Sequence, residues 1–214
     1  MVKLTKYEHA CLVLQNQGKT LVIDPGEFSP GFPLDATYDY VIVTHEHADH
    51  LSADKLKAIY LKNPSVHFFV NQKLYDENLR KLSPLHTIID AGVTASVDGF
   101  ELSFFGHDHA VIYKTSPCLN NGVLVNGTFY YPGDSLVLPD APIKLLAVPA
   151  AAPWLKTSEA MDFVKAVKPK QAFLTHDAML SDVGHLFTSG WVKGACSEVG
   201  AELIELKPGA THDF

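Results

Sequence analysis

The chain has 214 residues and a formal net charge of −7, and 47% of its residues are hydrophobic. An acidic chain without a run of Lys or Arg lacks the basic surface of a nucleic-acid binder or of a polybasic membrane segment. No apolar stretch approaches the roughly 20 residues of a membrane-spanning helix, and the first residues do not follow the signal-peptide pattern. The three Cys residues are widely spaced and form no CxxC pair, which favours a reducing compartment. We therefore expect a cytoplasmic protein.

Short β-type runs separated by turns make up the first third of the chain. Apolar or alternating patterns predict strands over residues 3–7, 10–15, 19–24, 38–45 and 66–70. The segment GEFSPGFP, residues 26–33, is a loop rich in Gly, Pro and aromatic residues. Ser52 can cap a helix over residues 53–62, and the apolar spacing of residues 74–82 fits a second helix.

The second half mixes strands and helices in the same way. Alternation predicts strands over residues 96–106, 110–115, 121–127 and 128–134, and the apolar run 143–150 is typical of a central strand. A helix over 157–169, with Thr157 as its cap, precedes a strand over 171–176 and a helix over 181–199. No linker or break in composition divides the chain. We predict one α/β domain over residues 1–214, in which each half supplies one sheet and its helices.

The six residues HEHADH, 45–50, follow the apolar strand YVIVT. In an extended segment His45 and His47 point to the same side, so they can bind one ion together. Asp49 and His50 come after the turn and can face a neighbouring position. Imidazole and carboxylate ligands suit Zn²⁺, Mn²⁺ or Fe, and the absence of Cys argues against a closed structural zinc site.

The motif resembles the H-x-H-x-D-H signature of the metallo-β-lactamase superfamily. LVIDPG before it, and YYPGDS and FLTHD after it, stand in the order that superfamily uses, so the likeness covers essentially the whole chain. The chain looks most similar to the small single-domain metal-dependent hydrolases and to the ascorbate-6-phosphate lactonase group. This resemblance implies a four-layer αββα sandwich with two divalent ions, most simply Zn²⁺, and hydrolysis by a hydroxide that bridges them.

The resemblance also assigns the site residues. The implied ligands are His45, His47, His109 and Asp134 for the first ion, and Asp49, His50, His176 and Asp134 for the second. Asp49 and the bridging Asp134 are the expected catalytic carboxylates, and Asp24 is expected behind them, orienting a ligand.

The segment FFGHDHA offers two histidines for the third ligand of the first ion. Strand parity places His107 and His109 on the same side and does not decide between them. The family pattern Gly-x-x-His-Ala selects His109 after Gly106, which leaves His107 as a flanking or substrate-facing residue. His9, His67 and His86 have no partner nearby in the sequence and are interpreted as ordinary strand or loop residues, and the tail around residue 212 is expected to be frayed.

The expected substrate is a small ester, lactone, amide or phosphodiester, contacted by Phe28, Phe32 and Trp154 at the rim of the site. Trp154 is equally well interpreted as a packing residue under a helix. Two alternatives remain open, an iron-dependent oxidoreductase on the same scaffold and a non-catalytic metal-binding domain. We expect no nucleic-acid or membrane partner, and a homo-oligomer is possible.

Overall fold

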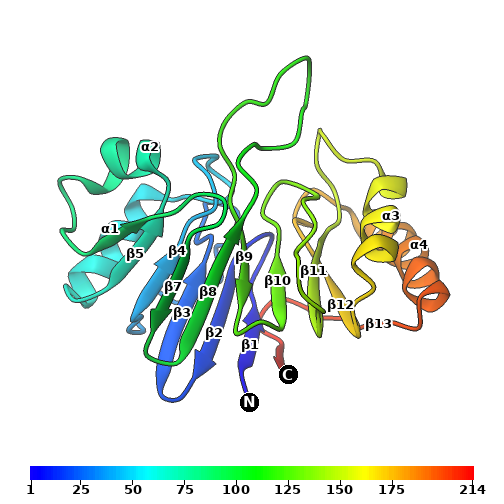
Figure 1. Cartoon of the computed structure of the whole chain (residues 1–214), viewed down its shortest axis with the longest axis horizontal. Coiled ribbons are helices and arrows are strands. Elements are labelled where there is room, and N and C mark those ends of the chain that lie inside the picture. Colours follow the sequence, from blue (N-terminus) through cyan, green and yellow to red (C-terminus); the bar gives the residue numbers. More distant parts are fainter.

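The computed structural model of residues 1–214 contains two seven-stranded sheets that pack face to face, with helices on both outer faces (Figure 1). The first sheet has the order β14 (Thr211–Asp213), β1 (Lys3–Lys6), β2 (Leu12–Asn16), β3 (Lys19–Ile23), β4 (Tyr40–Ile42), β5 (His67–Val70) and β6 (His86–Ile88). The second has the order β13 (Glu202–Leu203), β12 (Gln171–Thr175), β11 (Leu145–Pro149), β10 (Phe129–Tyr131), β9 (Gly122–Val125), β8 (Phe100–Phe105) and β7 (Thr94–Val97). The predicted four-layer αββα sandwich is confirmed.

The helices form the outer layers. On the first sheet lie α1 (Ala53–Lys62) and α2 (Gln72–Leu74), which continues into the π-helical turn η1 (Tyr75–Leu79), and on the second lie α3 (Thr157–Val167) and α4 (Asp182–Glu198) (Figure 1). The Ser52 hydroxyl accepts a hydrogen bond from the Lys55 amide at 3.4 Å and caps α1 as predicted. No helix is both long and apolar enough to cross a bilayer.

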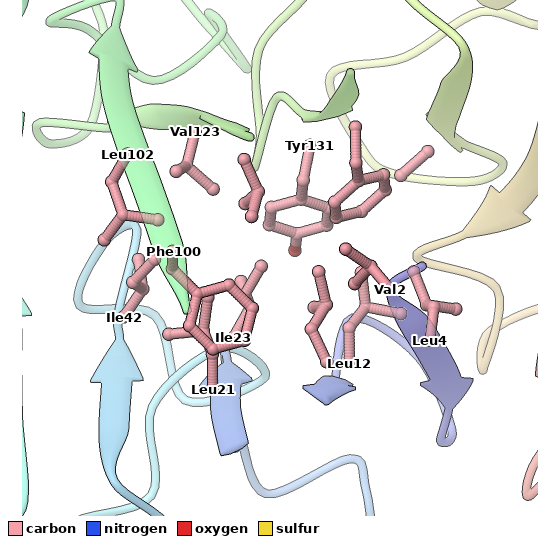
Figure 2. Close-up of a cluster of buried hydrophobic side chains, with 14 of the residues drawn as sticks. Val2, Leu4, Leu12, Leu21, Ile23, Ile42, Phe100, Leu102, Val123 and Tyr131 are labelled. Atoms are coloured by element: carbon pink, nitrogen blue, oxygen red, sulfur yellow. The ribbon is translucent and has the colours of Figure 1, made fainter. Parts of the chain in front are cut away.

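Both faces of each central strand are buried, which explains their continuous apolar runs. In β3, Leu21 and Ile23 point into the core between the sheets, whereas Val22 points into the core beneath α1. Figure 2 shows the core between the sheets, where Leu21 and Ile23 of one sheet face Phe100 and Tyr131 of the other. The ring of Tyr131 lies within this core and its hydroxyl points away from its own strand.

Three sequence-based expectations about secondary structure are wrong. Residues 110–115 form no strand; they belong to a loop between β8 and β9 that rises above both sheets in Figure 1 and exposes Val111, Ile112 and Tyr113. The C-terminal tail is not frayed, because β14 pairs antiparallel with β1, with His212 opposite Leu4. Helix α3 also begins differently from the expectation: Lys156 is the N-cap residue, and the Glu159 carboxylate accepts its amide hydrogen at 2.8 Å.

Parallel pairing brings the functional segments to one place. β3 and β4 run parallel in the first sheet, and β10, β11 and β12 run parallel in the second. Their carboxyl ends therefore share an edge, and these ends lead into the segments 24–26, 43–50, 132–135 and 176–177. Open α/β sheets commonly bind ligands at this edge.

Candidate metal centre

Two clusters of His and Asp side chains lie at this edge, each compact enough to surround one ion. In the first, the potential ligand atoms of His45, His47, His109 and Asp134 all lie within 4.8 Å of one another. In the second, the same holds for His9, Asp49, His50 and His176. The structure thus brings together all seven side chains expected as ligands and adds His9.

Asp134 lies between the clusters. Its Oδ2 is 3.2 Å from Nε2 of His109 in the first cluster and 3.2 Å from Nε2 of His176 in the second. Its Oδ1 is 3.0 Å from Nε2 of His50. One carboxylate therefore reaches both groups, as the bridging role expected for it requires.

Divalent cations fit these clusters because several of their polar atoms are buried without a hydrogen-bond partner. The four atoms are Nε2 of His45, Nε2 of His50, Nε2 of His176 and Oδ1 of Asp134. Leaving a buried polar atom unpaired costs about 1–3 kcal/mol. A cation coordinated by these atoms would give His45 Nε2 the partner it lacks, and it would replace the 3.0 and 3.2 Å contacts that His50 and His176 make with Asp134.

Hydrogen bonds to Nδ1 leave the Nε2 lone pairs of the ligand histidines free. Three of them meet an acceptor at Nδ1: His50 meets Asp24 at 2.7 Å, His109 meets the Ala110 carbonyl at 2.6 Å, and His176 meets the Ala151 carbonyl at 2.6 Å. In each, Nδ1 carries the proton, so Nε2 is free to bind a cation.

His45 also carries its proton on Nδ1, but its partner there is a hydroxyl group that is itself hydrogen-bonded to Asp24. Its Nδ1 lies 3.0 Å from the Thr44 hydroxyl, which donates its only hydrogen to Asp24 at 2.7 Å. The hydroxyl oxygen must therefore accept the Nδ1 hydrogen of His45. Nε2 of His45 is left with its lone pair toward the cluster.

Asp24 lies behind the ligand histidines, as expected, and orients them through hydrogen bonds. The side chain is fully buried and accepts four hydrogen bonds, from the Thr44 amide, the Thr44 hydroxyl, His50 Nδ1 and the Tyr131 hydroxyl, at 2.7–2.8 Å. Tyr131 reaches Asp24 from the core between the sheets, as its orientation in Figure 2 shows. Outer carboxylates of this kind fix the tautomer and ring orientation of ligand histidines.

His9 was interpreted from the sequence as an ordinary residue, and the structure corrects this. The ring is fully buried in the turn between β1 and β2, and its Nε2 lies 3.0 Å from Oδ2 of Asp49. Its Nδ1 accepts the amide hydrogen of Ala178 at 3.2 Å, so the proton of the neutral ring lies on Nε2. Unlike the ligand histidines, His9 donates from Nε2 and orients Asp49.

No sequence signal marks His9, because its partners lie 40 and 169 positions away. The backbone does carry a sign of function. His9, Asp24 and His176 adopt φ of 59°, 49° and 54°, in the left-handed region that residues other than Gly rarely occupy. Such strained residues gather at functional sites.

Close backbone contacts hold the ligand loops in place. A Cβ on Gly26 would overlap the Asp49 carbonyl, so only Gly lets the 24–26 segment approach the HEHADH loop this closely. On the other sheet, Asn120 accepts the Asp134 amide hydrogen at 2.9 Å and donates to the Pro132 carbonyl at 2.9 Å. Gly133 leaves the space that Asn120 occupies.

Burial and neighbouring carboxylates shift the pKa values of the ligand histidines in opposite directions. Burial lowers the pKa of His45 well below its usual range. Burial would also lower the pKa of His50 and His176, yet carboxylates outweigh it: Asp134 and Asp24 hold the pKa of His50 well above its usual range, and Asp134 and Asp49 raise that of His176 to about 9. Without metal, His50 and His176 thus each carry a second proton, on Nε2, at neutral pH, and a bound cation would displace it.

The residues expected at the substrate rim separate into different environments. Phe28 is half-exposed, with its ring centroid 5.3 Å from that of His9, which fits the expectation. Phe32 does not lie at the rim, because it is buried against Tyr38 with ring centroids 5.1 Å apart. His107 is exposed and pairs with Asp90 at 2.8 Å, outside both clusters.

Trp154 belongs to the wall of the centre and not to an exposed rim. It is 9% exposed, and its Nε1–H donates to Oδ2 of Asp134 at 2.9 Å. This hydrogen bond holds the bridging carboxylate from the side of the second sheet.

The thiol of Cys118 also lies close to the first cluster, 3.8 Å from Nε2 of His47, and burial raises its pKa to about 12. At neutral pH Cys118 is therefore a thiol and a poor nucleophile.

The sequence model of a family described as "Beta-lactamase superfamily domain" matches residues 3–176. The chain belongs to this superfamily. Protein Rv0786c of Mycobacterium tuberculosis is 30% identical over 186 residues, which cover 84% of this chain and 86% of that protein. A UPF0173 metal-dependent hydrolase of Carboxydothermus hydrogenoformans is 25% identical, with 92% and 96% covered.

A solved structure supports the fold independently of sequence identity. Igni18, described as a novel metallo hydrolase of the archaeon Ignicoccus hospitalis, superposes with a TM-score of 0.77 at 20% identity. The match covers 100% of this chain and 99% of that one. The metallo-β-lactamase fold expected from HEHADH and its companion motifs is confirmed over the whole chain.

Proposed function

We propose that this chain is a metal-dependent hydrolase with a two-ion centre that acts on a small ester, lactone, amide or phosphodiester. The observation that carries the proposal is the pair of clusters joined by Asp134, with four buried polar atoms that lack hydrogen-bond partners. Membership of the superfamily and the names of the relatives, metal-dependent hydrolases among them, support it.

The ligand residues form two groups, and each group would hold one cation. His45, His47 and His109 would hold one cation and Asp49, His50 and His176 the other, with Asp134 shared. Bound divalent ions lower the pKa of water and polarise a substrate carbonyl or phosphoryl oxygen.

The outer residues keep this centre in a fixed geometry. Asp24 and the Ala110 and Ala151 carbonyls keep the protons of three ligand histidines on Nδ1. His9 and Trp154 each donate one hydrogen bond, to Asp49 and Asp134 respectively, and so fix the two carboxylates. A preorganised site of this kind needs little rearrangement during reaction.

The surroundings of the centre suit a substrate with an apolar part. Phe28 lies beside the second cluster, and the loop between β8 and β9, which rises above the sheets in Figure 1, carries exposed Val111, Ile112 and Tyr113. Small-molecule sites combine such apolar surface with a few placed polar groups. We infer that the charged or polar reacting bond enters between the clusters while an apolar group stays against this surface.

The test is metal analysis followed by a substrate screen. Protein purified without added metal is expected to hold about two Zn²⁺ or Mn²⁺ per chain. It should hydrolyse a member of a lactone, thioester or phosphodiester panel in a chelator-sensitive way. Asp134→Asn is expected to abolish the activity, whereas His67→Ala, which alters a half-buried histidine outside both clusters, serves as the control. A well-folded protein without metal would refute the proposal, and iron with oxygen consumption in place of hydrolysis would favour the oxidoreductase alternative.

A further inference from the structure

The outward face of helix α4 carries an apolar stripe. Val183, Leu186, Phe187 and Trp191 recur at the spacing of one helical face, and their exposed fractions are 60–72%. The inward face is ordinary, with Val192, Ala195 and Cys196 buried against the second sheet. Helix α4 is thus apolar on both sides and lies at the outer edge of the molecule in Figure 1.

The stripe is too large to be scattered surface exposure. An aromatic side chain carries about 150–250 Å² of surface, so the four side chains together present on the order of 500 Å². An exposed patch of this size matches the largest one on a typical monomer, and such patches are often functional. A standard interface buries roughly 800 Å² on each partner, so the stripe supplies more than half of one.

The sizes of the side chains along the stripe indicate which kind of partner fits it. The first half of the helix carries the projecting side chains of Val183, Leu186 and Phe187. The second half carries Gly190 and Gly194, and a Cβ at either position would meet no atom within 4 Å. The second half therefore combines the projecting Trp191 with open space at the two glycine positions.

A second copy of the same helix, laid antiparallel, complements both halves. If the two-fold axis lies at the level of residue 188 along the helix, Leu186 of one copy lies opposite Gly190 of the other, and the same contact forms again by symmetry. Glycine permits the close helix approach that a leucine projection needs.

The charged side chains on α4 favour the same antiparallel pairing. The antiparallel pairing brings Asp182 of one copy next to the segment of the other copy that contains Lys193. Neither residue forms an ion pair within the chain, although both lie on the exposed part of α4. The pairing would form two Asp182–Lys193 contacts, which partly offset the repulsion between two chains of net charge −7.

A hollow beside the stripe extends the surface. A cavity of about 400 Å³ lies between α4 and residues 203–208, and it is lined by apolar side chains such as Leu186 and Leu206 together with charged ones such as Asp182, Glu205 and Lys207. Leu186 belongs both to the stripe and to this cavity. The docking surface therefore continues from the helix onto the C-terminal segment, which supplies area beyond the stripe.

We propose that α4 is a homodimer interface, in which two copies pair antiparallel through Val183, Leu186, Phe187, Gly190 and Trp191. This inference does not depend on the proposed hydrolase function. The metal clusters lie at the strand ends and α4 on the flank, so dimer formation leaves both centres intact.

Sedimentation velocity of the full chain over micromolar concentrations tests the proposal. The wild type is expected at twice its chain mass of 23.4 kDa. Phe187→Glu is expected to weaken the dimer by at least about tenfold. Leu61→Glu, at a position 68% exposed on α1, is the matched control and should leave the mass unchanged. A monomeric wild type, or equal dimers in both variants, would overturn the proposal.

Charge reversal tests the register in variants that keep the apolar stripe. Asp182→Lys alone and Lys193→Asp alone are each expected to weaken the dimer, and the double variant should restore it, because each contact regains opposite charges. A double variant no stronger than the single ones would overturn the antiparallel pairing. Trp191 provides a second readout: its emission should shift to the red on dilution in the wild type, against the constant signal of the buried Trp154.

Discussion

Replacing Asp24 with Asn should weaken the second metal position through His50, and the first through the Thr44 hydroxyl and His45, without unfolding the protein. The two side chains have the same shape, and Asn tolerates the left-handed backbone of residue 24, where φ is 49°. In the Asp24→Asn variant the amide oxygen can still accept the Thr44 amide hydrogen, as Oδ1 does now at 2.8 Å. The change therefore concerns the position of Oδ2, which becomes an –NH₂ group.

That –NH₂ group donates where the carboxylate accepts. His50 now gives its Nδ1 hydrogen to Oδ2 at 2.7 Å, and opposite an amide donor its ring must instead carry the proton on Nε2. Nε2 then cannot bind a cation. Loss of such an outer partner typically costs 10–100-fold in metal affinity, which is about 1.4–2.8 kcal/mol. Leaving one of the other donors to Oδ2 without an acceptor costs about 1–3 kcal/mol of stability.

Metal competition against a chromophoric chelator measures the affinities, and urea unfolding of the metal-free protein measures stability. Tyr131→Phe is the matched control, because it removes another donor to the same Oδ2 at 2.8 Å but leaves the proton of His50 on Nδ1. We expect a stability loss in both variants and a loss of metal affinity in Asp24→Asn alone. If Asp24→Asn binds the second ion as tightly as Tyr131→Phe does, the tautomer argument is refuted.

Three further predictions concern the same centre. His9→Ala should keep about two ions per chain but bind the second roughly tenfold more weakly; a fall to one ion would show that His9 is itself a ligand. His109→Ala should lose one ion and His107→Ala none, and intact metal content in the His109 variant would contradict the assignment. Loading the metal-free protein at pH 7.5 should release about two protons per chain, because the raised pKa values keep His50 and His176 protonated until a cation displaces the protons. Calorimetry in buffers of different ionisation enthalpy measures this release, and identical heats in all buffers would contradict it.

Local pattern predicted much of the architecture and of the centre. Alternation and apolar runs marked most strands, because a strand covered on both faces must be apolar throughout. HEHADH, the Asp after β3, the Asp after β10 and the His after β12 each follow a strand, and a polar residue at a strand end is visible in the sequence. The Ser52 cap was equally readable, since its hydrogen bond spans only three residues.

Local pattern failed where a partner distant in the sequence decides the conformation. Residues 110–115 alternate like a strand, yet no neighbouring strand lies beside them, so they form a loop. The tail at 211–213 becomes β14 only because β1 offers a free edge. Phe32 stands in a Gly/Pro-rich loop that looks exposed in the sequence, but it packs against Tyr38 in the core.

The chemical groups at the strand ends could be read from the chain, because ligand type and spacing are properties of a short segment. How those groups act depends on contacts that form only in the folded protein. Which nitrogen of each histidine carries the proton depends on what lies opposite Nδ1: a carbonyl at His176, but an amide hydrogen at His9. That difference makes one histidine available to a cation and the other a donor to Asp49, and it exists only once segments 169 residues apart meet.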